Sequence, residues 1–346
     1  MWPAARYRCV YAGEMKGRMW ELSIPLHSPF VTSIGRVTER RVVVILITDG
    51  SFTGWGEAAP YPGITPDSID DVWRTLERGS VLSPTAAAAL DEATADLTAR
   101  RDGKPLWESL GGTARSIPTS VAVGLDEDPV ERISATGAEG VKLKIMPGSD
   151  IARVSTVRSQ FPDLLIGVDA NGSYNWNDRG SLLAMDGMGV EYIEQPFPAD
   201  DLASHSRLRD EVVASVALDE PIDSEAAAIR AIETGACDLL VVKPARVGMK
   251  AARVIHDVAL AAGLRIKASG LLETEIGRAF THGIATLPGA IFSDVAEASW
   301  YLDGTIVSAG HDSNSTVATG IGFEPNPAVF ARYVVRASDL GSRIWD

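Results

Sequence analysis

Ionisable and hydroxyl side chains recur at a nearly constant interval through the middle of this chain, and each of them closes a short apolar run. The interval is 24 to 26 residues, and the marked positions are Lys144, Asp169, Glu194, Asp219, Lys243 and Ser269. A strand, a helix and their two loops occupy a similar length, and strands that alternate with helices form parallel sheets. The period therefore predicts strand–helix units with these side chains at the carboxyl ends of successive strands, where barrel enzymes keep their reactive groups.

The same period predicts one strand before Lys144 and one strand after Ser269. The first is expected at residues 116–124 and the eighth at 291–294. Because eight strands close a barrel, the fold class that follows is α/β, a (β/α)7β TIM-like barrel over residues 113–309.

The two ends of the chain predict an α+β capping domain, formed by residues 1–112 and the tail 310–346. Runs rich in β-branched and aromatic residues predict its strands. These runs lie at 6–11, 19–24 and 41–48. The Thr65-Pro66 pair is typical of a helix start, and an Ala-rich helix is expected at 85–101. We expect the tail to contain a helix at 327–336 and to pack back on this domain.

The acidic composition bears on possible partners. The formal net charge is −14 over 346 residues, so nucleic acid and anionic membranes are not expected partners. A bound cation and local lysines could still attract a small carboxylate substrate. Cys9 and Cys237 offer no disulfide framework, and no apolar leader is present. These features predict a cytoplasmic protein and leave a homo-oligomer open.

Three of the marked positions are carboxylates on consecutive predicted strands. Asp169, Glu194 and Asp219 would converge at one rim, where they repel one another unless a cation lies between them. Hard oxygen ligands favour Mg²⁺, with Mn²⁺ as an alternative. Any one of them alone would more simply be a helix cap or a surface residue, but three at equal spacing favour a metal site.

Lysines flank the carboxylates on both sides. Lys142 and Lys144 are two residues apart on one predicted strand, so they share a face, and burying both against helices would be costly. Lys243 ends a strand on the other side of the carboxylates. Two lysines that face each other across a carboxylate-bound cation indicate proton abstraction alpha to a carboxylate.

The motifs KxK, DAN, EQP, DE and KP on successive predicted strands resemble the enolase superfamily, muconate-lactonizing subgroup. The segments KLKIMPGSD, VVKPARVG and SGLLETEIGRA are most similar to the branch of o-succinylbenzoate synthases and N-succinylamino acid (N-acylamino acid) racemases. The sequence departs from that branch at Met249, Lys267 and Ser293.

The resemblance implies roles for individual residues. Lys144 would remove the alpha proton and help the hydroxyl leave, and Lys243 would stabilise the enediolate from the opposite face or act as the second acid–base group. Asp169, Glu194 and Asp219 would bind Mg²⁺. The substrate-binding residues that it implies are Lys142, Asn171, Arg246, Ser269, Gly270, Leu271, Phe30 and Ile34.

Four functions remain open at this point. The first is a Mg²⁺-dependent o-succinylbenzoate synthase, a lyase of menaquinone biosynthesis. The second is an N-succinylamino acid racemase, alone or together with the synthase activity, and Arg246 fits that branch. A muconate-type cycloisomerase is the third, and an inactive barrel that serves as a scaffold is the non-enzyme alternative.

Overall fold

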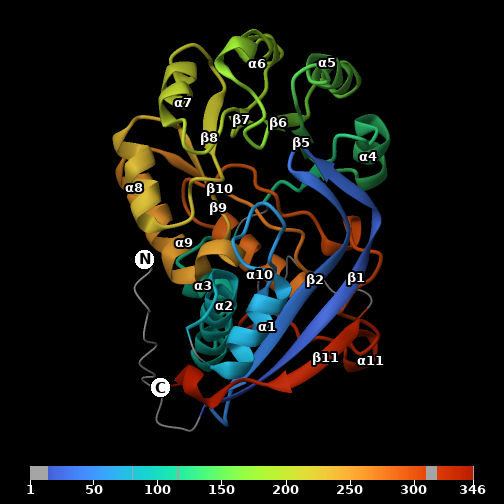
Figure 1. Ribbon diagram of the computed structural model, residues 1–346, viewed down its shortest axis with the longest axis vertical. Coiled ribbons are helices and arrows are strands. Elements are labelled where there is room, and N and C mark those ends of the chain that lie inside the picture. The colour runs from blue at the N-terminus through green and yellow to red at the C-terminus, as the bar shows by residue number, and fades with distance from the viewer. Residues whose placement is uncertain (1–14, 80, 115–116, 309–317, 346) are drawn as a thin grey trace.

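The computed structural model describes residues 15–79, 81–114, 117–308 and 318–345. These residues form a four-stranded antiparallel sheet and a seven-stranded parallel sheet. In Figure 1 the antiparallel sheet and helices α1 and α2 lie at one end of the molecule, and helices α5, α6 and α7 of the parallel sheet lie at the other. The strand expected at 6–11 falls outside the described residues.

The antiparallel sheet has the order β11-β1-β2-β3 and is apolar on both faces. Its strands are β1 (Lys16–Thr32), β2 (Gly35–Thr48), β3 (Thr53–Ala58) and β11 (Val334–Asp339). Because side chains alternate along a strand, Val43 and Ile45 pack with the helices of this domain, whereas Val42 and Val44 belong to the core shared with the barrel. The sheet thus joins the two parts of the molecule.

The helices of this domain differ from the sequence expectation at one end. They are α1 (Ile69–Arg78), α2 (Pro84–Arg101) and α3 (Leu106–Ser109). The helix start expected at Thr65-Pro66 is wrong, because Ser68 and Asp71 form a reciprocal capping box and α1 begins at Ile69. The Thr65 hydroxyl is instead bonded to the backbone of Tyr61.

The helix expected at 327–336 is also wrong in extent. The helix α11 (Pro327–Phe330) is a single turn, and the chain then enters β11, which pairs with β1 from Arg18↔Asp339 to Leu22↔Val334. The free edge of β1 offers a ladder of backbone hydrogen bonds that a continued helix could not use. Through this pairing the tail lies against the capping sheet (Figure 1).

The parallel sheet follows chain order from β4 to β10, with a helix after each strand. Its strands are β4 (Ser120–Val123), β5 (Gly140–Lys144), β6 (Leu165–Asp169), β7 (Tyr192–Glu194), β8 (Ser215–Leu218), β9 (Leu239–Val242) and β10 (Arg265–Ala268). The helices are α4 (Pro129–Thr136), α5 (Ile151–Gln160), α6 (Arg179–Asp186), α7 (Leu202–Arg209), α8 (Glu225–Glu233), α9 (Pro244–Ala261) and α10 (Glu275–Ala285). No helix in the described ranges combines the length and the apolar character that a bilayer crossing needs.

The eighth strand expected at 291–294 is not a regular strand. An isolated parallel bridge joins Ala290 to Ile266 of β10, and the Asp294 N–H donates to the Ala268 carbonyl at 2.9 Å. Beyond it, the Ser293 hydroxyl accepts the hydrogen bond of the Ala268 N–H at 3.0 Å, in a ladder position that a backbone carbonyl would otherwise fill. The α/β class with a capping sheet is therefore confirmed, whereas the described residues show seven regular parallel strands rather than a complete (β/α)7β barrel.

Strand β3 packs directly on helix α2, and a side chain of α2 accepts a hydrogen bond from the open edge of the strand. A Cβ atom at Gly56 would lie 2.1 Å from the Ala89 carbonyl oxygen, so only glycine permits this approach. The N–H of Glu57, at the open edge of the sheet, donates to the Glu92 carboxylate of α2 at 3.1 Å. A backbone N–H of this edge strand is thereby hydrogen-bonded to a helix side chain instead of to another strand.

This packing generates a prediction about stability. We expect Gly56→Ala to lower the free energy of unfolding by about 3 kcal/mol, because the added methyl group would overlap backbone atoms of α2. Urea denaturation measures the change. Gly35→Ala is the matched control, since nothing lies within 4 Å of a Cβ at that position. Equal effects of the two variants would contradict this account of the β3–α2 contact.

Candidate active site

The charged residues at the strand ends meet because neighbouring parallel strands are in register. Lys144 pairs with Asp169, and Asp169 pairs with Glu194. Asp219 follows the end of β8 and Lys243 the end of β9. All five side chains are buried. The carboxyl ends of five successive strands thus bring three carboxylates and two lysines to one rim of the sheet.

The first and the last of the three carboxylates, Asp169 and Asp219, are each paired with a lysine. Lys144 Nζ lies 2.6 Å from Asp169 Oδ2 and 2.6 Å from Asn171 Oδ1. Lys243 Nζ lies 2.5 Å from Asp219 Oδ2. The two ammonium groups therefore bind the first and last carboxylates of the set, with Glu194 on the strand between them.

Lys142 extends the cluster to the segment after β10. Its Nζ lies 3.2 Å from Asp169 Oδ2, 3.2 Å from Glu194 Oε1 and 2.6 Å from Asp294 Oδ2. Burial lowers the pKa of Lys142, but the three carboxylates outweigh burial and hold that pKa well above its usual value. Lys142 is consequently a fixed positive charge in this arrangement.

Lys267 and Asp294 form a buried pair that the sequence analysis did not assign to the site. Lys267 Nζ lies 2.6 Å from Asp294 Oδ2 and 3.2 Å from Glu194 Oε2, and Lys267 is fully buried. The Ser269 hydroxyl donates to the same Asp294 oxygen at 2.8 Å. The available signal was a lysine at position 267 between the apolar residues Ile266 and Ala268.

The carboxylates differ in their electrostatic surroundings. Burial opposes ionisation of Asp169, but Lys144 and Lys142 hold its pKa below the usual value. Glu194 is the opposite case, because burial and repulsion from Asp169 raise its pKa. Burial, together with repulsion from Asp219 and Asp169, raises the pKa of Glu220 to about 7. An additional cation between these groups would relieve the repulsion.

The donor set fits a hard divalent cation, although it is not assembled around one here. Among the described residues, no three His, Cys, Asp or Glu side chains are placed so that they could hold a metal ion, since ammonium groups lie between the carboxylates. Glu194 Oε2 and Asp219 Oδ1 are buried and accept no hydrogen bond. Lys267 and Arg246 lie 3.2 Å from them. Such oxygen atoms are suitable ligands for Mg²⁺.

Residues that follow the strand ends hold the carboxylates in place. The Gln195 amide accepts from the Asp219 N–H at 3.0 Å and donates to the Phe197 carbonyl at 2.9 Å. Arg246 donates to the carbonyl groups of Asp219 and Ile222 at 2.7 and 2.8 Å. The backbone of Gln195 has a φ of 42°, in the left-handed region that residues other than glycine rarely adopt. Arg246 therefore fixes the loop after β8 as well as contacting the Asp219 side chain.

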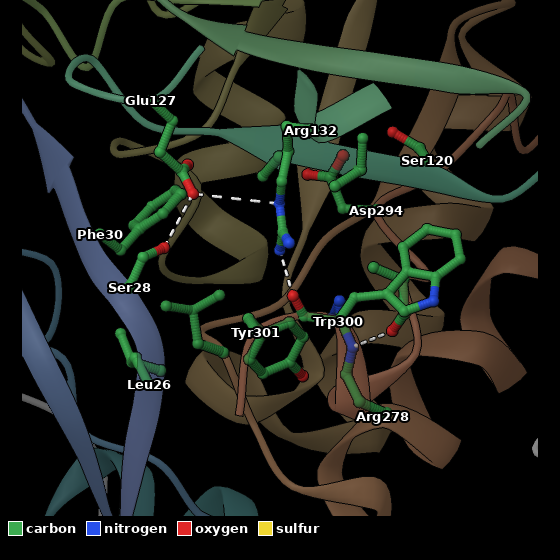
Figure 2. Close-up of a pocket in the computed structure, with 14 residues that line it drawn as sticks. Leu26, Ser28, Phe30, Ser120, Glu127, Arg132, Arg278, Asp294, Trp300 and Tyr301 are labelled. Carbon is green, nitrogen blue, oxygen red and sulfur yellow. Dashed lines mark hydrogen bonds and ion pairs between the residues drawn. The ribbon is translucent and has the colours of Figure 1, made fainter. Parts of the chain in front are cut away.

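Phe30 and Ile34 lie in the capping domain, outside the ion-pair cluster. Phe30 lines a pocket whose inner wall includes Asp294, and Figure 2 shows Phe30, Arg132 and Trp300 around it. Ile34 packs against Gly63, where a Cβ would lie 2.2 Å from its Cγ2. The pocket thus extends from strand β1 of the capping domain to Asp294, which Lys142 contacts.

The backbone N–H groups of Ser269 and Leu271 are already hydrogen-bonded within the protein. The Ser269 N–H donates to the Val242 carbonyl at 3.0 Å, and the Leu271 N–H donates to Glu273 Oε1 at 2.7 Å. Gly270 has no room for a side chain, because a Cβ would lie 2.2 Å from Glu273 Oε2. The structure thus places Ser269 in the cluster through its hydroxyl, and places Leu271 in a loop built around Glu273.

Comparison with known proteins gives a consistent result over nearly the whole chain. Residues 126–329 match the family described as enolase C-terminal domain-like, and residues 16–111 match the N-terminal domain of mandelate racemase / muconate lactonizing enzyme. The chain is 33% identical to an o-succinylbenzoate synthase of Bacillus subtilis, covering 92% of this chain and 96% of that protein. It is 32% identical to an N-succinylamino acid racemase of Thermus thermophilus, covering 87% and 91%. A solved member of the enolase superfamily from Listeria innocua superposes with a TM-score of 0.83 at 26% identity, covering 95% and 99%.

The buried pair of Lys267 and Asp294 yields a prediction that does not depend on any activity. Asp294 also contacts Lys142, and Lys267 also contacts Glu194. Removing either partner still unbalances the charge of the buried cluster, so we expect Lys267→Met and Asp294→Asn each to lower the free energy of unfolding by about 3 kcal/mol. The double variant should lose at least about 1.5 kcal/mol less than the sum of the two single variants. Chemical denaturation of the four proteins measures this coupling.

The exposed pair of Lys104 and Glu108, 3.3 Å apart, is the matched control. Its coupling should stay below about 0.5 kcal/mol, because solvent screens it. Additive effects at Lys267 and Asp294 would show that the two side chains do not depend on each other.

Proposed function

This chain belongs to the mandelate racemase / muconate lactonizing enzyme family of the enolase superfamily, and from that membership and the geometry of the strand ends we propose that it is a Mg²⁺-dependent o-succinylbenzoate synthase. The reaction would be the dehydration of a cyclohexadiene dicarboxylate through an enediolate, in menaquinone biosynthesis. The similarity to the Bacillus subtilis synthase over 92% of the chain supports this choice.

One observation carries the proposal, namely the position of the two lysines on either side of the carboxylates. Lys144 contacts Asp169 at one side, Lys243 contacts Asp219 at the other, and Glu194 lies on the strand between. A substrate carbon held over this set would have one amine on each face. That arrangement suits removal of a proton alpha to a carboxylate.

The carboxylates Asp169, Glu194 and Asp219 would hold Mg²⁺, which supplies positive charge that stabilises an enediolate. If a cation were bound there, the lysine ammonium groups would lose their present contacts with these carboxylates and would become available to an anionic substrate. Lys142, which lies against Asp169, Glu194 and Asp294, would then contact the substrate carboxylate.

Lys144 would carry out both proton transfers of the dehydration. In its neutral form it takes the alpha proton, so the carbon–hydrogen bond breaks and the electron pair moves into the enediolate. The resulting ammonium group then gives a proton to the departing hydroxyl group, which leaves as water. Lys243, which follows β9 on the opposite side of the carboxylates, would remain charged and stabilise the enediolate electrostatically.

The same geometry favours a second candidate, racemisation of an N-succinylamino acid. Because amines are present on both sides, one lysine can remove the alpha proton and the other, as an ammonium group, can donate its own proton to the opposite face. The 32% identity to the Thermus thermophilus racemase supports this candidate. Arg246, which holds the loop around Asp219, belongs to the same part of the site.

The first test is turnover of the cyclohexadiene precursor by the purified protein with Mg²⁺, followed by loss of the precursor's ultraviolet absorbance. We expect rapid turnover that EDTA abolishes and Mg²⁺ restores, because EDTA would remove the cation that stabilises the enediolate. Lys144→Ala and Lys243→Ala should each lower kcat by at least about a thousandfold, as expected for groups that act on the transition state.

Lys250→Ala is a suitable control, because its side chain is largely exposed and lies outside the strand-end cluster. A metal-loaded protein without turnover of the precursor would contradict the synthase proposal. Turnover of N-succinylamino acids by the same preparation would then favour the racemase.

A further inference from the structure

The loop between β10 and α10 forms part of the pocket wall in an unusual backbone conformation. Leu272, which lines the pocket together with Asp294, has a φ of 58°. Conformations of this kind persist only where the surroundings impose them. The contacts that impose it therefore bear on the shape of the pocket.

One of these contacts comes from Arg40 on β2 of the capping domain. Arg40 is buried, and its Nε donates to the Leu272 carbonyl at 3.3 Å. Its Nη2 donates to the carbonyl groups of Ala59 and Pro60 at 3.3 and 3.1 Å, and its guanidinium lies 4.9 Å from the ring centre of Tyr61. One side chain thus links the backbone of the capping domain to the backbone of the barrel loop.

A second contact comes from Glu57 on β3. Its Oε1 accepts from the Thr274 N–H at 3.0 Å, and its Oε2 accepts from the Gly277 N–H at 3.1 Å and from the Thr274 hydroxyl. These donors belong to the first turn of α10, whose backbone N–H groups have no partners within the helix. A capping-domain carboxylate therefore caps a barrel helix that follows the pocket loop directly.

The contact that Arg40 and Glu57 make between the capping domain and the barrel loop is more polar than stability alone would favour. Burial raises the pKa of Glu57 to about 7, which shows how unfavourable its surroundings are for a charge. Apolar side chains of similar size often replace buried charges without loss of stability. Directional hydrogen bonds, in contrast, define how the two backbones are placed relative to each other.

We infer that Arg40 and Glu57 are positioning residues through which the capping domain holds the barrel loop 270–277 in the conformation that completes the substrate pocket. The expected change in KM rests on the proposed function, whereas the expected change in hydrogen–deuterium exchange does not. Neither residue contacts the lysine and carboxylate cluster, so their loss should weaken substrate binding more than it slows the chemical steps.

The test compares Glu57→Gln with the unaltered full-length protein by hydrogen–deuterium exchange and by kinetics. A glutamine has one acceptor oxygen, so at least one of the three donors loses its partner. We expect amides of residues 270–278 to exchange at least tenfold faster, with the exchange of β5 to β9 unchanged. For the cyclohexadiene precursor, KM should rise at least fivefold while kcat stays within twofold.

Glu21→Gln is the matched control, because Glu21 is also a buried carboxylate of the capping sheet but pairs with Arg41 and Arg336. It should change neither the exchange of 270–278 nor KM. If Glu57→Gln does not fold, Arg40→Met gives the decisive measurement, with the same expected changes. Unchanged exchange in 270–278, or a fall in kcat at constant KM, would overturn the inference. If the unaltered protein does not turn over the precursor, the proposed function fails and the exchange measurement alone decides this inference.

Discussion

The repulsion among buried carboxylates at the strand ends is the constraint on which the rest of the site depends. Asp169, Glu194, Asp219 and Asp294 lie within one cluster from which solvent is largely excluded, and uncompensated charges there would each cost several kcal/mol. The chain compensates them with lysines of β5 and β10 and with Lys243, which follows β9. The sheet supplies the register and the lysines supply the opposite charge. Under the proposed function, a divalent cation would replace the ammonium groups that now lie between the carboxylates.

The capping domain contributes one side of the pocket, through residues of β1. Its sheet is apolar on both faces and shares one face with the barrel, so the two domains have a common core. Phe30 reaches the pocket from β1, and Arg40 and Glu57 reach the loop before α10. Under the proposed function, substrate recognition would depend on how one domain lies on the other, and the chemical steps would depend on the residues at the strand ends.

Much of this arrangement could be predicted from the sequence, because the side chains concerned follow a simple period. The positions of Lys144, Asp169 and Glu194 at strand ends follow from apolar runs spaced by one strand–helix unit. The irregular segment at 291–294 could not be predicted, since the Ser293 hydroxyl replaces a backbone acceptor there. The pairing of β11 with β1 depends on a strand edge more than 300 residues earlier in the chain, and local pattern carries no information about such a partner.

Anomalous scattering from crystals grown with Mn²⁺ tests the central claim most directly, because it locates the cation without reference to any reaction. We expect one ion at the carboxyl ends of β6, β7 and β8, coordinated by oxygen atoms of Asp169, Glu194 and Asp219, with the Lys144 ammonium group displaced from Asp169. Saturating Mn²⁺ that leaves these carboxylates paired with lysines, or that binds only elsewhere, would contradict the account.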